Sequence, residues 1–218
     1  MRTFSCKFEN KFSNCVLWLL QSSDCNLVRA PNQPQFHKKG SFRRAKATVI
    51  LMRNLFLPDD YQADIYCYNA EYLSSRGIRF LMCDIDNTLV TYDDPEPTER
   101  LLGWINELHA AGITIGFISN NSKERVELFN RSLGFIAYPD AHKPLTGTMK
   151  HFLSETEFKK EEIAHVGDQI FTDVCMAHAC DLTALLLPPI KDKKTFFFRF
   201  KRVLEKPFLA YFLKKHKA

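Results

Sequence analysis

The chain has 218 residues, of which 45% are hydrophobic and 25% are charged. This is ordinary globular composition, and it excludes collagen-like, wholly disordered and disulfide-scaffold proteins. The net charge of +5 is unevenly distributed, because residues 1–50 carry +7, residues 51–189 carry −10 and residues 190–218 carry +8. Two basic ends around an acidic centre indicate attraction to an anionic surface, phospholipid or nucleic acid, although basic ends also aid solubility.

The sequence shows no membrane span and no secretory signal. Its longest N-terminal apolar run, Cys15–Leu20, is shorter than the ~7 to 15 residues of a signal-peptide core and the ~18 to 20 residues of a span. The seven cysteines form no Cys-x-x-Cys pair, which favours reduced thiols in a cytoplasm-like compartment. The acid-poor, basic N-terminus also resembles an organelle transit peptide, so the matrix of an organelle stays an alternative.

Residues 1–51 show no sustained period and are expected to form a disordered basic extension. From residue 78, apolar runs predict strands at residues 78–83, 113–118, 135–138, 163–166 and 183–187. Between them, apolar periodicity predicts three helices. The first ends at Gly112, the second runs to Leu133 and the third passes through Met149–Leu153. Asn121 and Glu124 predict a capping box at the start of the second helix. Alternating strands and helices predict an α/β fold with a parallel sheet flanked by helices.

Polar residues follow the predicted strands, at the sheet edge where reactive groups of parallel sheets collect. They are Asp84 with Asp86, Ser119 with Asn120, Lys143, and Asp168 with Asp173. Asp84, Asp86 and Asp168 form an oxygen-rich, cysteine-free group, which suits Mg²⁺ rather than zinc. Lys143 and the Ser119 hydroxyl supply the positive charge and the donor that phosphoryl oxygens require. These residues together predict phosphoryl transfer.

The segments that carry these residues resemble the four motifs of the haloacid dehalogenase (HAD) superfamily. In order, they are Asp84–Leu89, Ser119–Asn121, Lys143–Pro144 and Gly167–Asp173. Residues 52–210 are similar to the YqeG-type subfamily, class IIIA, whose relatives include mitochondrial phosphatidylglycerophosphatases. The resemblance implies a Rossmann-like HAD core at residues 52–189 with little or no cap domain, because each inter-motif segment has room for about one helix. Residues 190–218 are then a basic, aromatic tail.

The resemblance also implies a role for each residue. Asp84 attacks phosphorus and becomes an aspartyl phosphate, and Asp86 protonates the leaving alkoxide and later deprotonates water. Mg²⁺ is held by the Asp84 carboxylate, the Asp86 backbone carbonyl and Asp168. The phosphoryl group is bound by Ser119, Asn120 and Lys143, while Asp173 orients Lys143 or a water molecule on the metal. Two further residues receive structural interpretations: Asn121 as a helix cap and Gly167 as a turn.

The basic, aromatic tail and the expected absence of a cap domain both indicate which class of substrate the site accepts. An open site depends on its substrate or on a surface to exclude water, and the aromatic and basic residues of 190–218 suit the headgroup region of an anionic membrane. The tail could instead pack on the domain through Val203, Leu204, Phe208 and Phe212, or bind nucleic acid.

The resemblance implies hydrolysis of phosphatidylglycerophosphate to phosphatidylglycerol, in phospholipid biosynthesis, by an enzyme peripheral on the inner face of a membrane, cytoplasmic or in the mitochondrial matrix. One alternative is a phosphatase of a soluble sugar phosphate, nucleotide or phosphoprotein. Another is a non-catalytic RNA- or ribosome-associated module, against which the intact carboxylate cluster argues.

Overall fold

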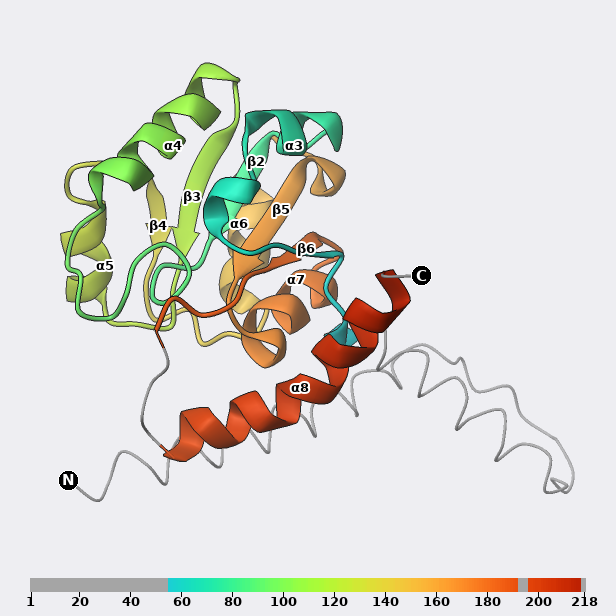
Figure 1. Cartoon of the computed structure of the whole chain (residues 1–218). Coiled ribbons are helices and arrows are strands. Elements are labelled where there is room, and N and C mark those ends of the chain that lie inside the picture. Colours follow the sequence, from blue (N-terminus) through green and yellow to red (C-terminus); the bar gives the residue numbers. More distant parts are fainter. Residues whose placement is uncertain (1–54, 192–195, 217–218) are drawn as a thin grey trace, which may run out of the picture. The chain divides into compact units, whose positions relative to one another are not determined.

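The structure is a computed structural model that describes residues 55–191 and 196–216. The expected N-terminal extension, residues 1–51, lies outside the described residues. All described residues belong to one compact unit, Ile50–Ala218. Its described part holds a six-stranded sheet with the strand order β1-β6-β5-β2-β3-β4 (Figure 1). Each strand pairs in parallel with its neighbours, which confirms the predicted α/β fold class.

The five predicted strands are present within a residue or two of their expected bounds. The strands are β1 Asp60–Tyr61, β2 Phe80–Cys83, β3 Thr114–Ile118, β4 Ile136–Tyr138, β5 Ile163–Gly167 and β6 Thr183–Leu186. Every residue of β2 and β5 is buried, and burial on both faces explains why these strands are nearly unbroken apolar runs. The sequence analysis missed β1, because two residues carry no periodic pattern.

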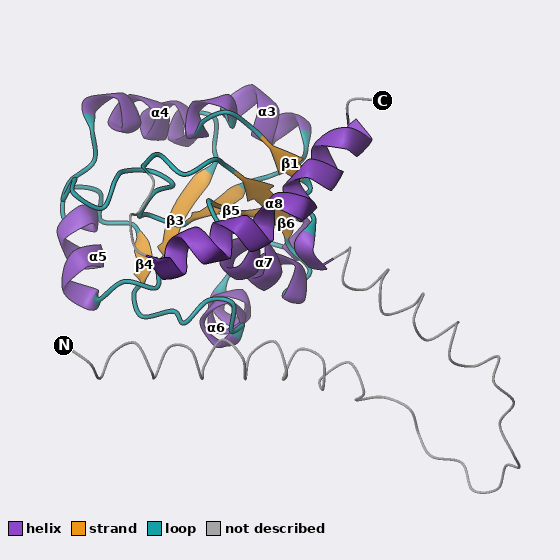
Figure 2. Cartoon of the chain, turned by 60° about the horizontal axis from the view of Figure 1, so that its bottom comes forward, coloured by secondary structure: helices purple, strands orange, loops and turns teal. Residues whose placement is uncertain are grey.

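Helices cover both faces of the sheet. They are α3 Ala70–Ser75, α4 Glu99–Ala110, α5 Lys123–Asn130, α6 Gly147–Glu155, α7 Cys175–Ala179 and α8 Phe196–His216, with single turns at Ile65–Cys67, Lys160–Glu162 and Ile170–Val174. Leu73, Leu101 and Phe129 bring α3, α4 and α5 into one hydrophobic cluster. Met149 and Met176 bring α6 and α7 into a second cluster on the opposite face (Figure 2).

The predicted start of α5 is wrong. The helix begins at Lys123 with Ser122 as its N-cap residue and has no side-chain cap hydrogen bond. Oδ1 of Asn121 accepts the backbone N–H of Ser122 at 2.9 Å rather than an N–H inside the helix, and its Nδ2 donates to Oδ2 of Asp86 at 3.0 Å. The helix also ends before Leu133, since the Asn130 side chain bonds the backbone N–H and C=O of Phe135 and closes a turn.

No inserted domain separates the strands in the described part of the chain: β2 and β3 are joined through α4, and β3 and β4 through α5. Within the predicted tail, residues Phe196–His216 form the helix α8. Its Glu205 and Phe212 are 5% exposed, and its Phe208 and Leu209 pack against the second cluster. One face of the predicted tail therefore packs on the domain. None of the described helices is long and apolar enough to cross a membrane.

Candidate active site

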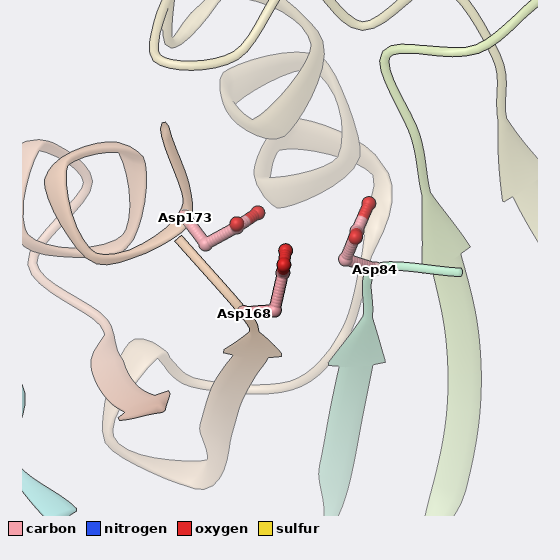
Figure 3. Close-up of side chains that lie close together, drawn as sticks. All are labelled: Asp84, Asp168 and Asp173. Atoms are coloured by element: carbon pink, nitrogen blue, oxygen red, sulfur yellow. The ribbon is translucent and has the colours of Figure 1, made fainter. Parts of the chain in front are cut away.

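The carboxyl ends of β2, β3 and β5 bring the predicted site residues to one edge of the sheet. Cys83, the last residue of β2, lies opposite Phe117 of β3 and Val166 of β5. Asp84 therefore leaves the sheet beside the segment that carries Asp168. Figure 3 shows the side chains of Asp84, Asp168 and Asp173 converging at this edge.

The three carboxylates form a buried cluster. One oxygen from each of Asp84, Asp168 and Asp173 lies within 4.8 Å of the other two. Burial, with the charges of Asp173 and Asp168, raises the pKa of Asp84 to about 7 against the opposing effect of Lys143. Burial also raises the pKa of Asp168. The cluster therefore holds more negative charge than its surroundings favour.

Lys143 supplies positive charge to this cluster. Its Nζ donates to Oδ1 of Asp84 at 2.6 Å and to Oδ1 of Asp173 at 2.7 Å. Burial by itself would lower the pKa of Lys143, but the two carboxylates hold it above the usual range. Burial likewise opposes ionisation of Asp173, yet Lys143 and His165 hold the pKa of Asp173 below its usual range. The Lys143–Asp173 pair is therefore ionised.

Gly167 is needed for a close approach rather than for the predicted turn. It is the last residue of β5, and a Cβ built there would lie 2.7 Å from Oδ2 of Asp173 and closer still to its Cβ and Cγ. Oδ2 of Asp173 also accepts from the backbone N–H of Gln169 at 3.1 Å. The glycine therefore lets Asp173 fold back against the strand that precedes it.

The Asp86 side chain is held apart from the cluster. Its Oδ1 accepts from Nη2 and Nε of Arg125 at 2.9 and 3.2 Å, and its Oδ2 accepts from Asn121. Asn87 follows with φ +71°, a left-handed conformation that asparagine tolerates better than most residues. The two aspartates of the first motif therefore have different partners and can do different work.

The other predicted phosphoryl-binding residues lie beside the cluster. Ser119 is 2% exposed, and its Oγ accepts from the backbone N–H of Asn121 at 3.1 Å. The side chain of Asn120 accepts the backbone N–H of Lys143 and donates to the Lys143 carbonyl. The Asn120 side chain is therefore occupied by the backbone of Lys143. These two hydrogen bonds fix the segment that carries the lysine.

Three site residues were missed by the sequence analysis. Arg125, on α5, gave no sequence signal, since it resembles any arginine on a helix surface. His165 is 1% exposed; its Nε2 lies 3.2 Å from Oδ1 of Asp173 and its Nδ1 lies 3.0 Å from the Met82 carbonyl. Burial lowers the pKa of His165. A lone polar side chain within an apolar strand was the signal available for it.

Arg202 is the third missed residue, and it comes from α8. Its guanidinium donates to the carboxylate and to the backbone carbonyl of Asp168. It also donates to Oε2 of Glu205 at 3.0 Å, and Glu205 accepts the backbone N–H of Phe171 at 3.2 Å. The C-terminal helix therefore contacts the fourth motif directly.

The donor set fits a hard divalent cation. Three buried carboxylates, Asp84, Asp168 and Asp173, form ion pairs with two basic side chains of the described residues, Lys143 and Arg202. The available ligand atoms are all oxygens, as Mg²⁺ prefers. A cation at this edge would remove the excess negative charge that raises the pKa of Asp84.

Comparisons with known proteins find similarity over most of the chain. Residues 41–181 match the family model of haloacid dehalogenase-like hydrolases. The chain is 33% identical over 160 residues to "Probable phosphatase YqeG" of Bacillus subtilis (strain 168), covering 73% of this chain and 93% of that protein.

The solved structures that resemble this chain have lower sequence identity to it. An uncharacterised protein from Listeria monocytogenes serotype 4b has a TM-score of 0.45 and 16% identity, covering 54% of this chain and 85% of that one. The cobalt-bound deoxy-D-mannose-octulosonate 8-phosphate phosphatase of Haemophilus influenzae has a TM-score of 0.39 and 14% identity, covering 63% and 90%.

Proposed function

The chain belongs to the haloacid dehalogenase-like hydrolases, and we propose that it is a Mg²⁺-dependent phosphatase in which Asp84 is the nucleophile. The observation that carries the proposal is the buried cluster of Asp84, Asp168 and Asp173, joined to Lys143 and lying beside a separately held Asp86. A bound Mg²⁺, on Asp84, Asp168 and the Asp86 backbone carbonyl, would supply positive charge against the phosphoryl oxygens.

The contacts of Asp84 suit nucleophilic attack. Lys143 donates to Oδ1 of Asp84, and Thr88 Oγ1 donates to Oδ2 at 3.2 Å, so the carboxylate has a fixed orientation. An oxygen of Asp84 forms a bond to phosphorus while the bond from phosphorus to the substrate alcohol breaks. Lys143 and Ser119 then bind the phosphoryl oxygens, and Asp173 keeps Lys143 in place.

Asp86, whose carboxylate is held in a fixed orientation outside the cluster, is the residue proposed for proton transfer. Asp86 donates a proton to the departing alkoxide and later takes a proton from the water that hydrolyses the aspartyl phosphate. Hydrolysis releases inorganic phosphate and restores the Asp84 carboxylate. Arg125 and Asn121 hold the Asp86 side chain, so both act as positioning residues.

We further propose that the substrate is phosphatidylglycerophosphate and that the product is phosphatidylglycerol, made at the inner face of a membrane. The identity of this lipid substrate is inferred from the resemblance to YqeG-type proteins. It is supported by an apolar stripe on α8, which consists of Phe200, Leu204 and Tyr211 with exposures of 53%, 43% and 40%. Spacings of four and seven residues put these side chains on one side of a helix, where they can enter a lipid headgroup region.

The test is phosphate release from phosphatidylglycerophosphate in mixed anionic vesicles with Mg²⁺. Wild type is expected to release phosphate, and Asp84→Asn is expected to be inactive. Phe200→Ser combined with Leu204→Ser is expected to lose activity on vesicles while keeping activity on a soluble phosphomonoester. Ile136→Ser removes an equally exposed apolar residue, at 43%, and serves as the matched control. If wild type hydrolyses soluble phosphomonoesters but releases no phosphate from the lipid, the protein is a phosphatase of soluble substrates and phosphatidylglycerophosphate is excluded as its substrate.

A further inference from the structure

A cavity of about 790 Å³ lies between α8 and the segment that follows β6. This size falls within the ~300 to 1,000 Å³ of small-molecule sites. One end of the cavity is formed by Asn87 and Asp168, which belong to the candidate active site. An apolar wall is formed by Leu186, Leu187, Pro188, Pro189 and Ile190. The opposite wall is α8, so the cavity extends the active site along this helix.

The α8 wall is strongly basic. Arg199, Arg202 and Lys206 line it, together with Val203, Glu205 and Leu209. Arg202 and Glu205 are already paired with each other and with the fourth motif. Arg199 and Lys206, by contrast, form no ion pair with any described residue, since the ion pairs of α8 are those of Arg202. Two cations that have no carboxylate partner within the described part of the chain therefore line a cavity whose other wall is apolar.

The helix that carries these two cations is held in place by contacts of their neighbours. Glu205 precedes Lys206 and accepts the Phe171 N–H. Lys201 donates to Oε1 of Gln169, and the ring of Phe208 lies 5.8 Å from that of Phe171. The helix is thus attached to the fourth motif at several points.

We propose that this cavity binds the leaving group of the substrate, and that the leaving group carries a second anionic group, which Arg199 and Lys206 bind. The substrate class is then a phosphomonoester whose alcohol contains a phosphodiester or a similar anion. Asp84, whose carboxylate lies within 4.8 Å of that of Asp168, attacks the terminal phosphoryl group next to the Asp168 end of the cavity, while the second anion is held on α8. The inference rests on the proposed function, and it names the specificity residues of the same site.

The kinetic test compares two soluble substrates with Mg²⁺. Glycerophosphoglycerol phosphate carries a phosphodiester in its leaving group, whereas p-nitrophenyl phosphate carries no second anion. In the double variant Arg199→Gln/Lys206→Gln, the preference for the first substrate, measured as the ratio of the two kcat/KM values, is expected to fall about tenfold, mainly through KM. Lys150→Gln removes an exposed lysine on α6 and is expected to keep the wild-type ratio. An unchanged ratio in the double variant would overturn the inference.

A binding measurement separates this inference from the proposed function. Glycerophosphoglycerol keeps the phosphodiester but has no phosphate to transfer, so calorimetry with it does not depend on turnover. Binding to wild type that weakens about tenfold in the double variant supports the cavity as the binding site of the second anion. If this is observed while no phosphomonoester is hydrolysed, the proposed function alone fails. Hydrolysis with equal selectivity and equal affinity in both proteins would leave the phosphatase intact and contradict the subsite.

Discussion

Arg202, on the last helix of the chain, donates to both the carboxylate and the backbone carbonyl of Asp168, at the end of β5. A basic side chain from a segment outside the four motifs therefore lies on a carboxylate that is a candidate metal ligand. Repulsion between the guanidinium and a divalent cation opposes metal binding. The same contact attaches α8 to the site, so metal affinity and the position of the helix are linked.

Replacement of Arg202 is expected to strengthen metal binding. In Arg202→Gln, a cation at Asp168 no longer competes with the guanidinium, and the dissociation constant for Mg²⁺ should fall about tenfold. Titration calorimetry measures this constant without turnover, and Lys150→Gln provides the control. Weaker Mg²⁺ binding in Arg202→Gln would show that the arginine supports the metal site rather than opposing it.

Metal binding is expected to depend on pH through Asp84. Burial and the neighbouring carboxylates raise the pKa of Asp84 to about 7, so below this pH a proton must leave before the carboxylate binds a cation. The dissociation constant for Mg²⁺ should therefore rise as pH falls from 8 to 6, approaching tenfold per unit below the pKa. Calorimetry in buffers of different ionisation enthalpy measures the released proton. A constant that stays flat over this range would contradict the assignment, and Asp84→Asn should show a weaker dependence, because Asp168, whose pKa is also raised, remains.

The separate environment of Asp86 predicts a dependence on the leaving group. Asp86→Asn removes the general acid, which costs about 10²- to 10⁴-fold when the leaving group needs a proton. Glycerol 3-phosphate has such a leaving group, whereas p-nitrophenolate departs readily without one. Arg125→Gln should show a smaller loss with the same preference, in kcat rather than KM. Equal losses on both substrates would indicate a structural role for Arg125 only.

Gly167 predicts a clear stability difference between two glycines. Gly167→Ala places a methyl group against the Asp173 side chain and should destabilise the fold by ~1 to 3 kcal/mol. Gly103, in α4, has nothing within 4 Å of a built Cβ, so Gly103→Ala should stabilise by ~0.5 to 1 kcal/mol. Denaturant midpoints measure both values. Equal midpoints for the two variants would argue against the close approach of Asp173.

The sequence predicted the features of the fold and the site that depend on local residue patterns and on the order of the strands. Buried strands such as β2 and β5 are apolar runs, and the residues after them had to meet at one edge, so Asp84, Lys143 and Asp168 were found. The partners of these residues could not be found in the same way. Asn121 was interpreted as a cap because local spacing favoured it, whereas in the folded chain its amide donates to Asp86, 35 residues away. Arg202 and the docking of α8 likewise depend on tertiary contacts that no periodicity encodes.

The most direct test of the central claim is to look for phosphate on Asp84. The full-length protein with Mg²⁺ is mixed with excess phosphomonoester, quenched in acid within one turnover, digested and mapped by mass spectrometry. The account predicts a phosphorylated peptide whose modified residue is Asp84, absent when Mg²⁺ is removed and absent in Asp84→Asn. Mg²⁺-dependent phosphate release by an Asp84→Asn protein, or by a wild type that never carries phosphate on Asp84, would contradict it.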